Sequence, residues 1–220
     1  MAAAPAPSSA TPPPAAREQL LETASQIMRD EDTVDVSLSE LAARSGLNSA
    51  LVKYYFGNKA GLMKALLERD FAGILKAVDA LLAKEADPET KLRLHMTAVV
   101  NTFFRTPYIH RLLMRLIRQE PPEVAQHLAD TCLQPMLDAY ERLIGEGVEA
   151  GVFRPVDPQF FYFTVIGAAD RFFSARLVLR YCSGRDVLDE SLRDGYRAHL
   201  NDFVVAGILV PHDGQCDRLS

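Results

Sequence analysis

A short segment in the first third of the chain carries side chains that can form hydrogen bonds with a nucleic acid. It places an amide, a hydroxyl, a small residue, an ammonium group and a phenol at Asn48, Ser49, Ala50, Lys53 and Tyr54. Such groups bind base edges and phosphate oxygens when one element exposes them together. Their types and spacing predict a DNA-contacting surface, provided that the chain presents them outward.

The residues just before this segment are predicted to form a short helix. Ser37 and Glu40 make a Ser-x-x-Glu capping box, in which two side chains satisfy backbone donors at a helix start. Gly46 ends the helix because glycine adopts the left-handed conformation of a helix C-terminus without a steric penalty. The predicted contact residues therefore follow a tight turn.

A second short helix is predicted to follow that turn. Asn48 or Ser49 can cap it, and Gly57 ends it. Two short helices joined by so tight a turn cross steeply, so the second can enter a DNA major groove. The alternative is an αα-hairpin without a DNA-binding role, since the same geometry occurs in other helical proteins.

Charge around this helix pair is locally basic. Positions 41–67 contain no Asp or Glu, and their basic residues are Arg44, Lys53, Lys59 and Lys64. Residues 17–71 nonetheless hold seven basic and nine acidic side chains. Most of the acids cluster in 18–35, where we expect them to lie away from the DNA-contacting face. Phosphate binding needs a basic surface rather than a basic total, and the modest charge indicates few phosphate contacts.

Residues 17–71 closely resemble the N-terminal domain of TetR-family transcriptional regulators. The resemblance covers the expected helix 17–30, the run SLSELAARSGL and the run YYFGNKAGLMKAL. Its most specific part is an aromatic-Phe-x-Asn-Lys-x-x-Leu pattern, formed here by Tyr55, Phe56, Asn58, Lys59 and Leu62.

The resemblance implies roles for individual side chains. Ser39 falls where a residue of the first short helix touches phosphate or a base, Tyr55 at an aromatic position that meets DNA, and Lys59 at a phosphate contact. At Lys53 the sequence departs from the family, which usually has Tyr there, so an ammonium group replaces a phenol. The predicted DNA-contact residues are therefore Ser39, Asn48, Ser49, Ala50, Lys53, Tyr54, Tyr55 and Lys59.

The rest of the chain shows helix boundaries and no convincing strand alternation. We predict an all-α fold of about nine helices, with a three-helix head, a connecting fourth helix and a five-helix body. The predicted division is a disordered Ala/Pro-rich arm at 1–16, a helix-turn-helix DNA-binding domain at 17–62, a helical ligand-binding and dimerisation domain at 63–207, and a flexible tail at 208–220. Beyond the head, the expected helices span 58–84, 87–105, 106–119, 122–150 with a kink at Pro135, 158–182 and 186–207.

Two of these expected helices are candidates for a subunit interface. The helix at 158–182 is apolar on most sides, and such a helix must be buried on all of them. In a body of five helices a second subunit can cover one face. The alternative is a purely intramolecular core. The family resemblance implies a homodimer in which 158–182 and 186–207 form a four-helix bundle across a two-fold axis.

Polar side chains interrupt the apolar helices of the body. They include His95 and Arg105 on one expected helix, His110 on the next, and Asp170 on the helix 158–182. A buried charge is unfavourable unless it is paired, so Asp170 either forms a structural salt bridge or anchors a ligand. The predicted pocket residues are Phe103, Phe104, Met114, Arg115, Phe161, Tyr162, Asp170 and Phe172.

The resemblance implies a cytoplasmic repressor that binds a palindromic double-stranded DNA operator as a homodimer. A small-molecule effector in the body shifts the fourth helix and releases the DNA. The alternative function is a dimeric helical adaptor that binds protein, against which the acid-free stretch 41–67 argues.

The sequence points away from several other classes. It has none of the glycine-rich phosphate loops or zinc-protease and serine-hydrolase motifs of enzymes. No cofactor, metal site or membrane-spanning segment is expected. Three widely spaced cysteines, Cys132, Cys182 and Cys216, are interpreted as packed or incidental thiols, with redox sensing as the alternative.

Overall fold

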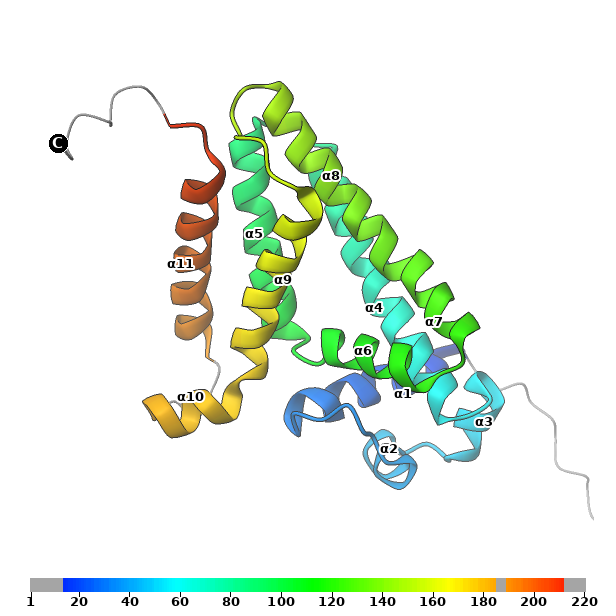
Figure 1. The fold of residues 1–220 in the computed structure, drawn as a ribbon. Helices are drawn as coiled ribbons and strands as arrows, with labels where there is room; N and C mark the ends of the chain where they lie inside the picture. Colours follow the sequence, from blue (N-terminus) through cyan, green and yellow to red (C-terminus); the bar gives the residue numbers. More distant parts are fainter. Residues whose placement is uncertain (1–13, 185–188, 212–220) are drawn as a thin grey trace, which may run out of the picture. The chain divides into compact units, whose positions relative to one another are not determined.

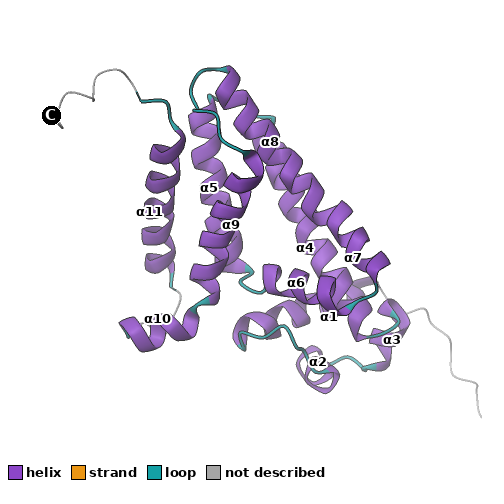
Figure 2. Ribbon diagram, viewed as in Figure 1, coloured by secondary structure: helices purple, strands orange, loops and turns teal. Residues whose placement is uncertain are grey.

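The computed structural model describes residues 14–184 and 189–211, and these residues are almost entirely helical (Figures 1 and 2). Within them an isolated antiparallel bridge pairs Phe153 with Leu209. The chain forms two compact units, the first ending at Leu66 and the second beginning at Leu67. The predicted all-α class is confirmed.

The first unit contains three helices and the start of a fourth. They are α1 (Pro14–Asp30), α2 (Leu38–Ser45), α3 (Ala50–Phe56) and α4 (Lys59–Leu82). Helix α1 begins at Pro14 rather than at the expected Arg17, and the remainder of the predicted arm, 1–13, lies outside the described residues. Side chains from all four helices are almost fully buried together, among them Leu20, Leu21, Ala24, Ile27, Leu41, Val52, Leu62 and Leu66.

Local signals explain where α2 begins and ends. The Ser37 hydroxyl accepts a hydrogen bond from the backbone N–H of Glu40 at 3.3 Å, which is one half of the predicted capping box. The Glu40 carboxylate lies 3.3 Å from Nε of Arg44 instead of completing the box. Gly46 has φ 67° and donates its N–H to the carbonyl of Ala42, so the predicted glycine C-terminus is confirmed.

The junction between α3 and α4 is also specified locally. The Asn58 side chain accepts a hydrogen bond from the N–H of Gly61 at 2.9 Å, which caps the start of α4. A Cβ atom at Gly61 would overlap the carbonyl oxygen of Phe56 at the end of α3. Glycine therefore allows these two helix ends to approach closely.

The second unit is built from the remainder of α4 and the helices that follow it. These are α5 (Pro88–Arg105), α6 (Ile109–Gln119), α7 (Pro122–Leu128), the π-helical segment η1 (Ala129–Leu133), α8 (Gln134–Glu149), α9 (Pro158–Ser174), α10 (Arg176–Ser183) and α11 (Glu190–Ile208). Helix α5 packs against α8, α9 and α11, and Figure 1 shows α11 running beside it. This packing makes α5 the central element of the unit.

The long helix expected over 122–150 is irregular in the middle. A π-helical segment, Ala129–Leu133, separates α7 from α8 and ends just before Pro135. Proline lacks a backbone N–H and clashes with the preceding turn, so the disturbance expected at Pro135 appears in the turn before it.

The helix expected over 158–182 is not continuous. Helix α9 ends at Ser174, Ala175 leaves the helical conformation with φ −92° and ψ 28°, and α10 begins at Arg176. Neither proline nor glycine stands at this break, so helix-breaker residues could not indicate it. The last helix starts after Asp189, whose carboxylate accepts the N–H of Leu192 at 2.8 Å. Of the predicted tail 208–220, residues 212–220 lie outside the described part.

Candidate functional site

Helix α3 presents most of the predicted DNA-contact side chains to solvent. Asn48, Ser49, Ala50 and Lys53 are exposed, and Tyr54 is 58% exposed, whereas Val52 on the opposite face is 1% exposed. One face of α3 therefore packs on the first unit and the other is accessible. This is the geometry that a groove-reading helix needs.

The start of α3 is closed by a side chain. The Asn48 carboxamide oxygen accepts a hydrogen bond from the N–H of Ala50 at 2.8 Å, while Ser49 makes no side-chain capping bond. Of the two caps that the sequence allowed, Asn48 is the one used. The amide nitrogen of Asn48 and the hydroxyl of Ser49 lie on exposed residues at the helix start and can donate to an acceptor such as a phosphate or base.

The remaining predicted DNA-contact residues differ in exposure and in the side chains that they touch. Ser39 is exposed and its hydroxyl lies 2.6 Å from that of Ser37. Tyr55 is half-buried, and its ring packs edge-on against Tyr54 at a centroid distance of 5.0 Å. The Arg17 guanidinium lies 5.2 Å from the ring centre of Phe56. An aromatic cluster therefore backs the accessible face of α3.

The acidic residues do not lie apart from the basic ones, as the sequence had suggested. Lys59 Nζ is 2.6 Å from the Asp35 carboxylate. Arg44 lies 2.9 Å from both Asp30 and Glu31. The segment 30–35 folds back onto these cations because it connects α1 to α2, a proximity that composition could not indicate.

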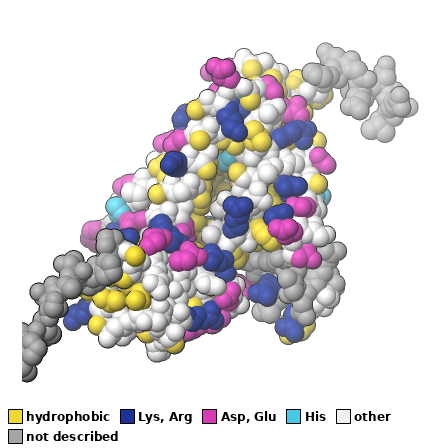
Figure 3. Space-filling view, turned by 180° about the vertical axis from the view of Figure 1, so that it is seen from behind, with side chains coloured by type: hydrophobic (Ala, Val, Ile, Leu, Met, Phe, Trp, Pro, Cys, Tyr) yellow, Lys and Arg dark blue, Asp and Glu magenta, His cyan; other side chains and the backbone are white. Residues whose placement is uncertain are grey.

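Lys53 is the basic residue best placed to bind a phosphate. It is exposed on α3, and within 14–184 and 189–211 no acidic side chain pairs with it. The departure from the usual family tyrosine thus leaves an unpaired ammonium on the accessible face. Over the surface seen in Figure 3, by contrast, Lys and Arg side chains intermix with Asp and Glu.

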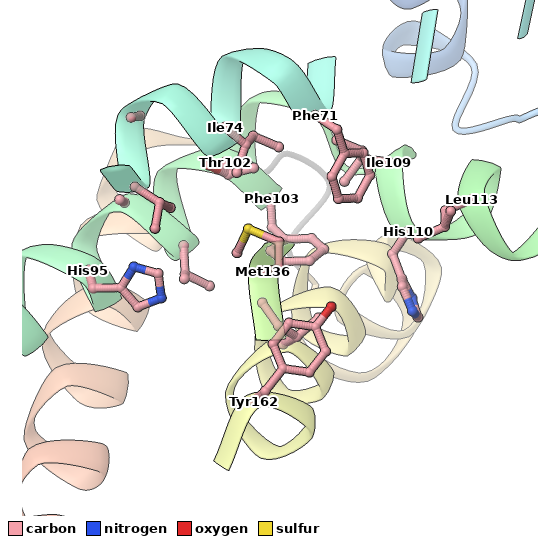
Figure 4. A pocket seen from close by; sticks show the side chains of 15 residues that line it. Phe71, Ile74, His95, Thr102, Phe103, Ile109, His110, Leu113, Met136 and Tyr162 are labelled. Carbon is pink, nitrogen blue, oxygen red and sulfur yellow. The ribbon is translucent and has the colours of Figure 1, made fainter. Parts of the chain in front are cut away.

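A cavity lies in the second unit among α4, α5, α6, α8 and α9. The empty space within it is about 660 Å³ when its opening to solvent is included. The wall is mostly apolar (Figure 4) and consists of Phe71, Ile74, Ala77, Val78, His95, Ala98, Val99, Thr102, Phe103, Ile109, His110, Leu113, Met136, Tyr162 and Ile166.

Two of the predicted pocket residues, Phe103 and Tyr162, line this cavity. The others lie outside its wall: Phe104 packs edge-on against Phe173, Phe172 stacks on Tyr196 at 3.8 Å, and Arg115 bonds to Gln119. Successive helix residues point about 100° apart, so a neighbour of a wall residue faces elsewhere. Met114 and Phe161 are half-buried and also lie outside the wall.

Asp170 contacts a histidine of the cavity wall, and its second carboxylate oxygen is buried without a hydrogen-bond partner among the described residues. Its Oδ2 lies 3.0 Å from Nδ1 of His110, which does line the cavity. The carboxylate therefore sits behind the wall and fixes the imidazole of His110.

Sequence reasoning did not place His95, Thr102, Ile109, His110 or Met136 in the wall. The two histidines had been noticed as polar interruptions of apolar helices. Spacing could have joined His95, Thr102 and the neighbouring Val99 on one face, since residues three, four and seven apart share a helix face. Which face meets the cavity depends on packing.

His95 is the most unusual member of the wall. It is 2% exposed, and neither ring nitrogen has a hydrogen-bond partner among the described residues. Burial lowers the pKa of His95 to about 4, so the ring is neutral at pH 7. A buried polar group left unpaired is unfavourable by about 1–3 kcal/mol. Its ring packs edge-on at 4.8 Å against Tyr140, whose hydroxyl is likewise unpartnered in the described chain.

Other chemistry has little support in the described residues. No cluster of three or more His, Cys, Asp or Glu side chains in 14–184 and 189–211 is arranged to hold a metal ion. None of the helices described is long and apolar enough to cross a bilayer. Cys132 is buried and Cys182 exposed, both as free thiols, and Cys216 lies outside the described residues.

An accessible helix after a tight turn, followed by a helical unit with a cavity, is the arrangement expected of a helix-turn-helix DNA-binding regulator. Residues 20–66 match the bacterial regulatory proteins of the tetR family, and residues 85–214 match the tetracyclin repressor-like C-terminal domain. The chain belongs to the TetR family of DNA-binding transcriptional regulators, which are not enzymes.

Individual curated relatives match part of the chain. The HTH-type transcriptional regulator BetI of Stenotrophomonas maltophilia is 31% identical over 104 residues, which cover 47% of this chain and 51% of that protein. The chain thus spans about half the length of the curated relatives it matches.

Solved structures support the fold over most of the chain. The ketosteroid transcriptional regulator KstR2 of Mycobacterium tuberculosis has a TM-score of 0.68 at 19% identity, covering 92% of this chain and 99% of that one. The regulator FadR of Bacillus subtilis, solved in complex with stearoyl-CoA, has a TM-score of 0.65 at 16% identity, covering 87% and 98%.

Proposed function

We propose that this protein is a repressor that binds a palindromic DNA operator as a homodimer and is released by a small-molecule effector. The observation that carries the DNA-binding step is the exposed face of α3, with Asn48, Ser49, Lys53 and Tyr54 accessible while Val52 is buried. We assign base-edge and phosphate contacts to this face, and supporting phosphate contacts to Ser39, Tyr55 and Lys59. Residues 17–62 make up the DNA-binding domain in this proposal and 63–207 the effector and dimerisation domain.

The proposed homodimer forms through α9 and α11. Phe160 and Phe163 on α9 are 71% and 61% exposed, and Phe203 on α11 is 69% exposed. Large aromatic side chains this accessible mark surfaces that bind another protein. A two-fold axis through this surface would pair two copies of α3 for successive major grooves, ~34 Å apart.

The proposed effector binds in the cavity of the second unit. Helix α4 starts at Lys59, beside α3 in the chain, and contributes Phe71, Ile74 and Val78 to the cavity wall. Displacing these side chains moves the helix that carries the DNA-binding unit. A coupling of ~1–3 kcal/mol, typical of allosteric proteins, reduces DNA affinity ~5–150-fold. That FadR was solved with stearoyl-CoA and KstR2 is a ketosteroid regulator supports a small-molecule effector here.

Selection from a random DNA pool tests the proposal. The full chain should enrich an inverted repeat, and Lys53→Ala should weaken binding to all sequences alike and reduce the magnitude of the salt slope by about 1, because a phosphate contact is lost. Lys76→Ala is the matched control, since Lys76 is exposed on α4 in the second unit. Failure to enrich any site, or equal losses for the two variants, would contradict the assignment of α3.

A further inference from the structure

The cavity contains a polar side chain that is available to a ligand. His95 projects from α5 with its two ring nitrogens unpartnered among the described residues. Figure 4 shows its imidazole at one end of the cavity and that of His110 at the other, with Phe103, Met136 and Tyr162 between them. The imidazole of His110 is already bonded to Asp170 at 3.0 Å. His95 therefore keeps both ring nitrogens available, whereas one ring nitrogen of His110 is already bonded.

The wall contains no carboxylate, ammonium or guanidinium group that would favour an ionic ligand. None of the fifteen described residues that line the cavity is Asp, Glu, Lys or Arg. Apart from His95 and His110, the polar members are Thr102 and Tyr162. An ion moved from water into such a wall loses hydration without gaining a counter-charge. Asp170 stands outside the wall and is engaged by His110.

The pKa values of His95 and Tyr162 also favour an uncharged ligand. Burial lowers the pKa of His95 to about 4 and raises the pKa of Tyr162 to about 12. At neutral pH the imidazole is uncharged and offers one N–H donor and one nitrogen acceptor. It can therefore bond to a hydroxyl in either direction, or donate to a carbonyl.

We infer that the cavity binds an uncharged, mainly apolar molecule with one hydroxyl or carbonyl group, which hydrogen-bonds to His95. This inference rests on the proposed function, in which the cavity holds the effector, and it names the effector's chemical class. The apolar body packs against Phe103, Met136 and Ile166, and the polar group pairs the buried imidazole that the protein leaves unpaired.

Two matched sets of probes test the inference by calorimetry on the full chain at pH 7.5. The one-ring set is p-cresol, toluene, benzoate and benzylammonium. The two-ring set is 2-naphthol, naphthalene, 2-naphthoate and 2-naphthylmethylammonium. Within at least one set the hydroxyl probe should bind about five-fold more tightly than the hydrocarbon, the ratio for one net hydrogen bond. It should bind at least ten-fold more tightly than either ion.

Substitutions at His95 test whether its imidazole causes the preference for the hydroxyl probe. His95→Phe should bring the hydroxyl-to-hydrocarbon ratio close to one while the hydrocarbon still binds, and His95→Gln should retain a preference because an amide both donates and accepts. His127→Phe is the matched control, since His127 is exposed on α7, bonded to Glu68, and outside the cavity wall. Circular dichroism and thermal unfolding establish that each variant is folded. If His95→Phe does not fold, the inference is judged on the hydroxyl-to-hydrocarbon and hydroxyl-to-ion affinity ratios of the wild type and of His95→Gln.

Several results would overturn the inference: no binding by any probe, equal binding of hydroxyl and hydrocarbon probes, tightest binding by an ion, or an unchanged preference in His95→Phe. DNA release is measured separately on the selected site. A hydroxyl probe that binds through His95 without releasing DNA contradicts the effector step of the proposed function but leaves the ligand class standing. DNA release by an ion that binds in the cavity contradicts the ligand class alone.

Discussion

At the scale of single residues, the most informative contacts are those between opposite charges in the first unit. Lys59, which the family resemblance assigns to phosphate, is held by Asp35 at 2.6 Å. Both side chains are exposed, at 36% and 65%, so the pair itself is weak, worth about 0.2–1 kcal/mol. In the proposed phosphate contact, DNA competes with Asp35 for the ammonium group, so we expect Asp35 to affect the affinity.

Opposite effects are expected from substitutions at the two ends of this pair. Lys59→Ala should weaken binding to all sequences and reduce the magnitude of the salt slope by about 0.9, the value for one phosphate contact. Asp35→Asn should instead strengthen binding roughly two- to five-fold, because the ammonium is freed. Fluorescence anisotropy across a salt titration measures both. Asp79→Asn, which removes an exposed ion pair with Arg142 in the second unit, is the control.

An unchanged slope for Lys59→Ala would remove Lys59 from the contacts. No gain for Asp35→Asn would mean that the ion pair does not compete with DNA.

His95 should make stability depend on pH. Its pKa is about 4 in the folded chain against an ordinary 6.5, so the unfolded chain binds more protons between these values. Above about pH 6.5 the imidazole is neutral in both states, so His95 does not reduce the free energy of unfolding. As the pH drops toward 4, protonation of the unfolded chain lowers that free energy by up to about 3 kcal/mol. Tyr140, which contacts the ring, has a pKa raised well above 10 by burial and does not titrate in this window.

Urea unfolding from pH 7.5 to 4.5, compared between wild type and His95→Phe, measures this contribution. The variant should lack the part of the pH dependence that belongs to His95. Parallel curves for the two proteins would show that His95 is not buried in the neutral form.

At the scale of elements, the end of α3 and the start of α4 approach each other closely at Gly61. Gly61→Ala would place a methyl group against the Phe56 carbonyl and should lower stability by about 1–3 kcal/mol. Gly73→Ala on the same helix meets nothing within 4 Å and should raise stability by up to about 1 kcal/mol, since alanine favours helix. Equilibrium urea unfolding of both variants measures the difference, and similar shifts would mean that the junction tolerates a side chain.

The sequence predicted well those helix ends that are marked by a capping residue or a glycine. Ser37, Gly46 and Asn58 act within three or four residues of themselves, and each lies at the helix end expected of it. The break at Ala175 has no such signal, and α9 was predicted too long.

The pocket was harder to predict than the helices that form it. Helical spacing shows which residues share a face, but not which face meets a cavity. That is why Phe103 and Tyr162 line the cavity, whereas Phe104 and Phe172, which were predicted beside them, do not. The exposure of α3, by contrast, followed from the short turn and the polar residues beside it.

At the scale of the whole molecule, the aromatic surface on α9 and α11 bears on assembly. Phe163→Glu introduces a charge into a surface that the proposal buries between subunits, so it should convert the dimer to monomer. Light scattering after size-exclusion chromatography measures the mass. Leu94→Glu alters an exposed apolar residue of α5, 38% accessible, and should leave the dimer intact. A wild-type monomer, or dissociation by both variants alike, would contradict the interface.

The central claim is that two copies of α3 read DNA together. Sedimentation of the full chain with the duplex enriched from a random pool counts the protomers on each site. We predict two protomers per duplex on an inverted repeat, and loss of the complex when one half-site is scrambled. One protomer per duplex, or equal binding to scrambled DNA, would contradict the account.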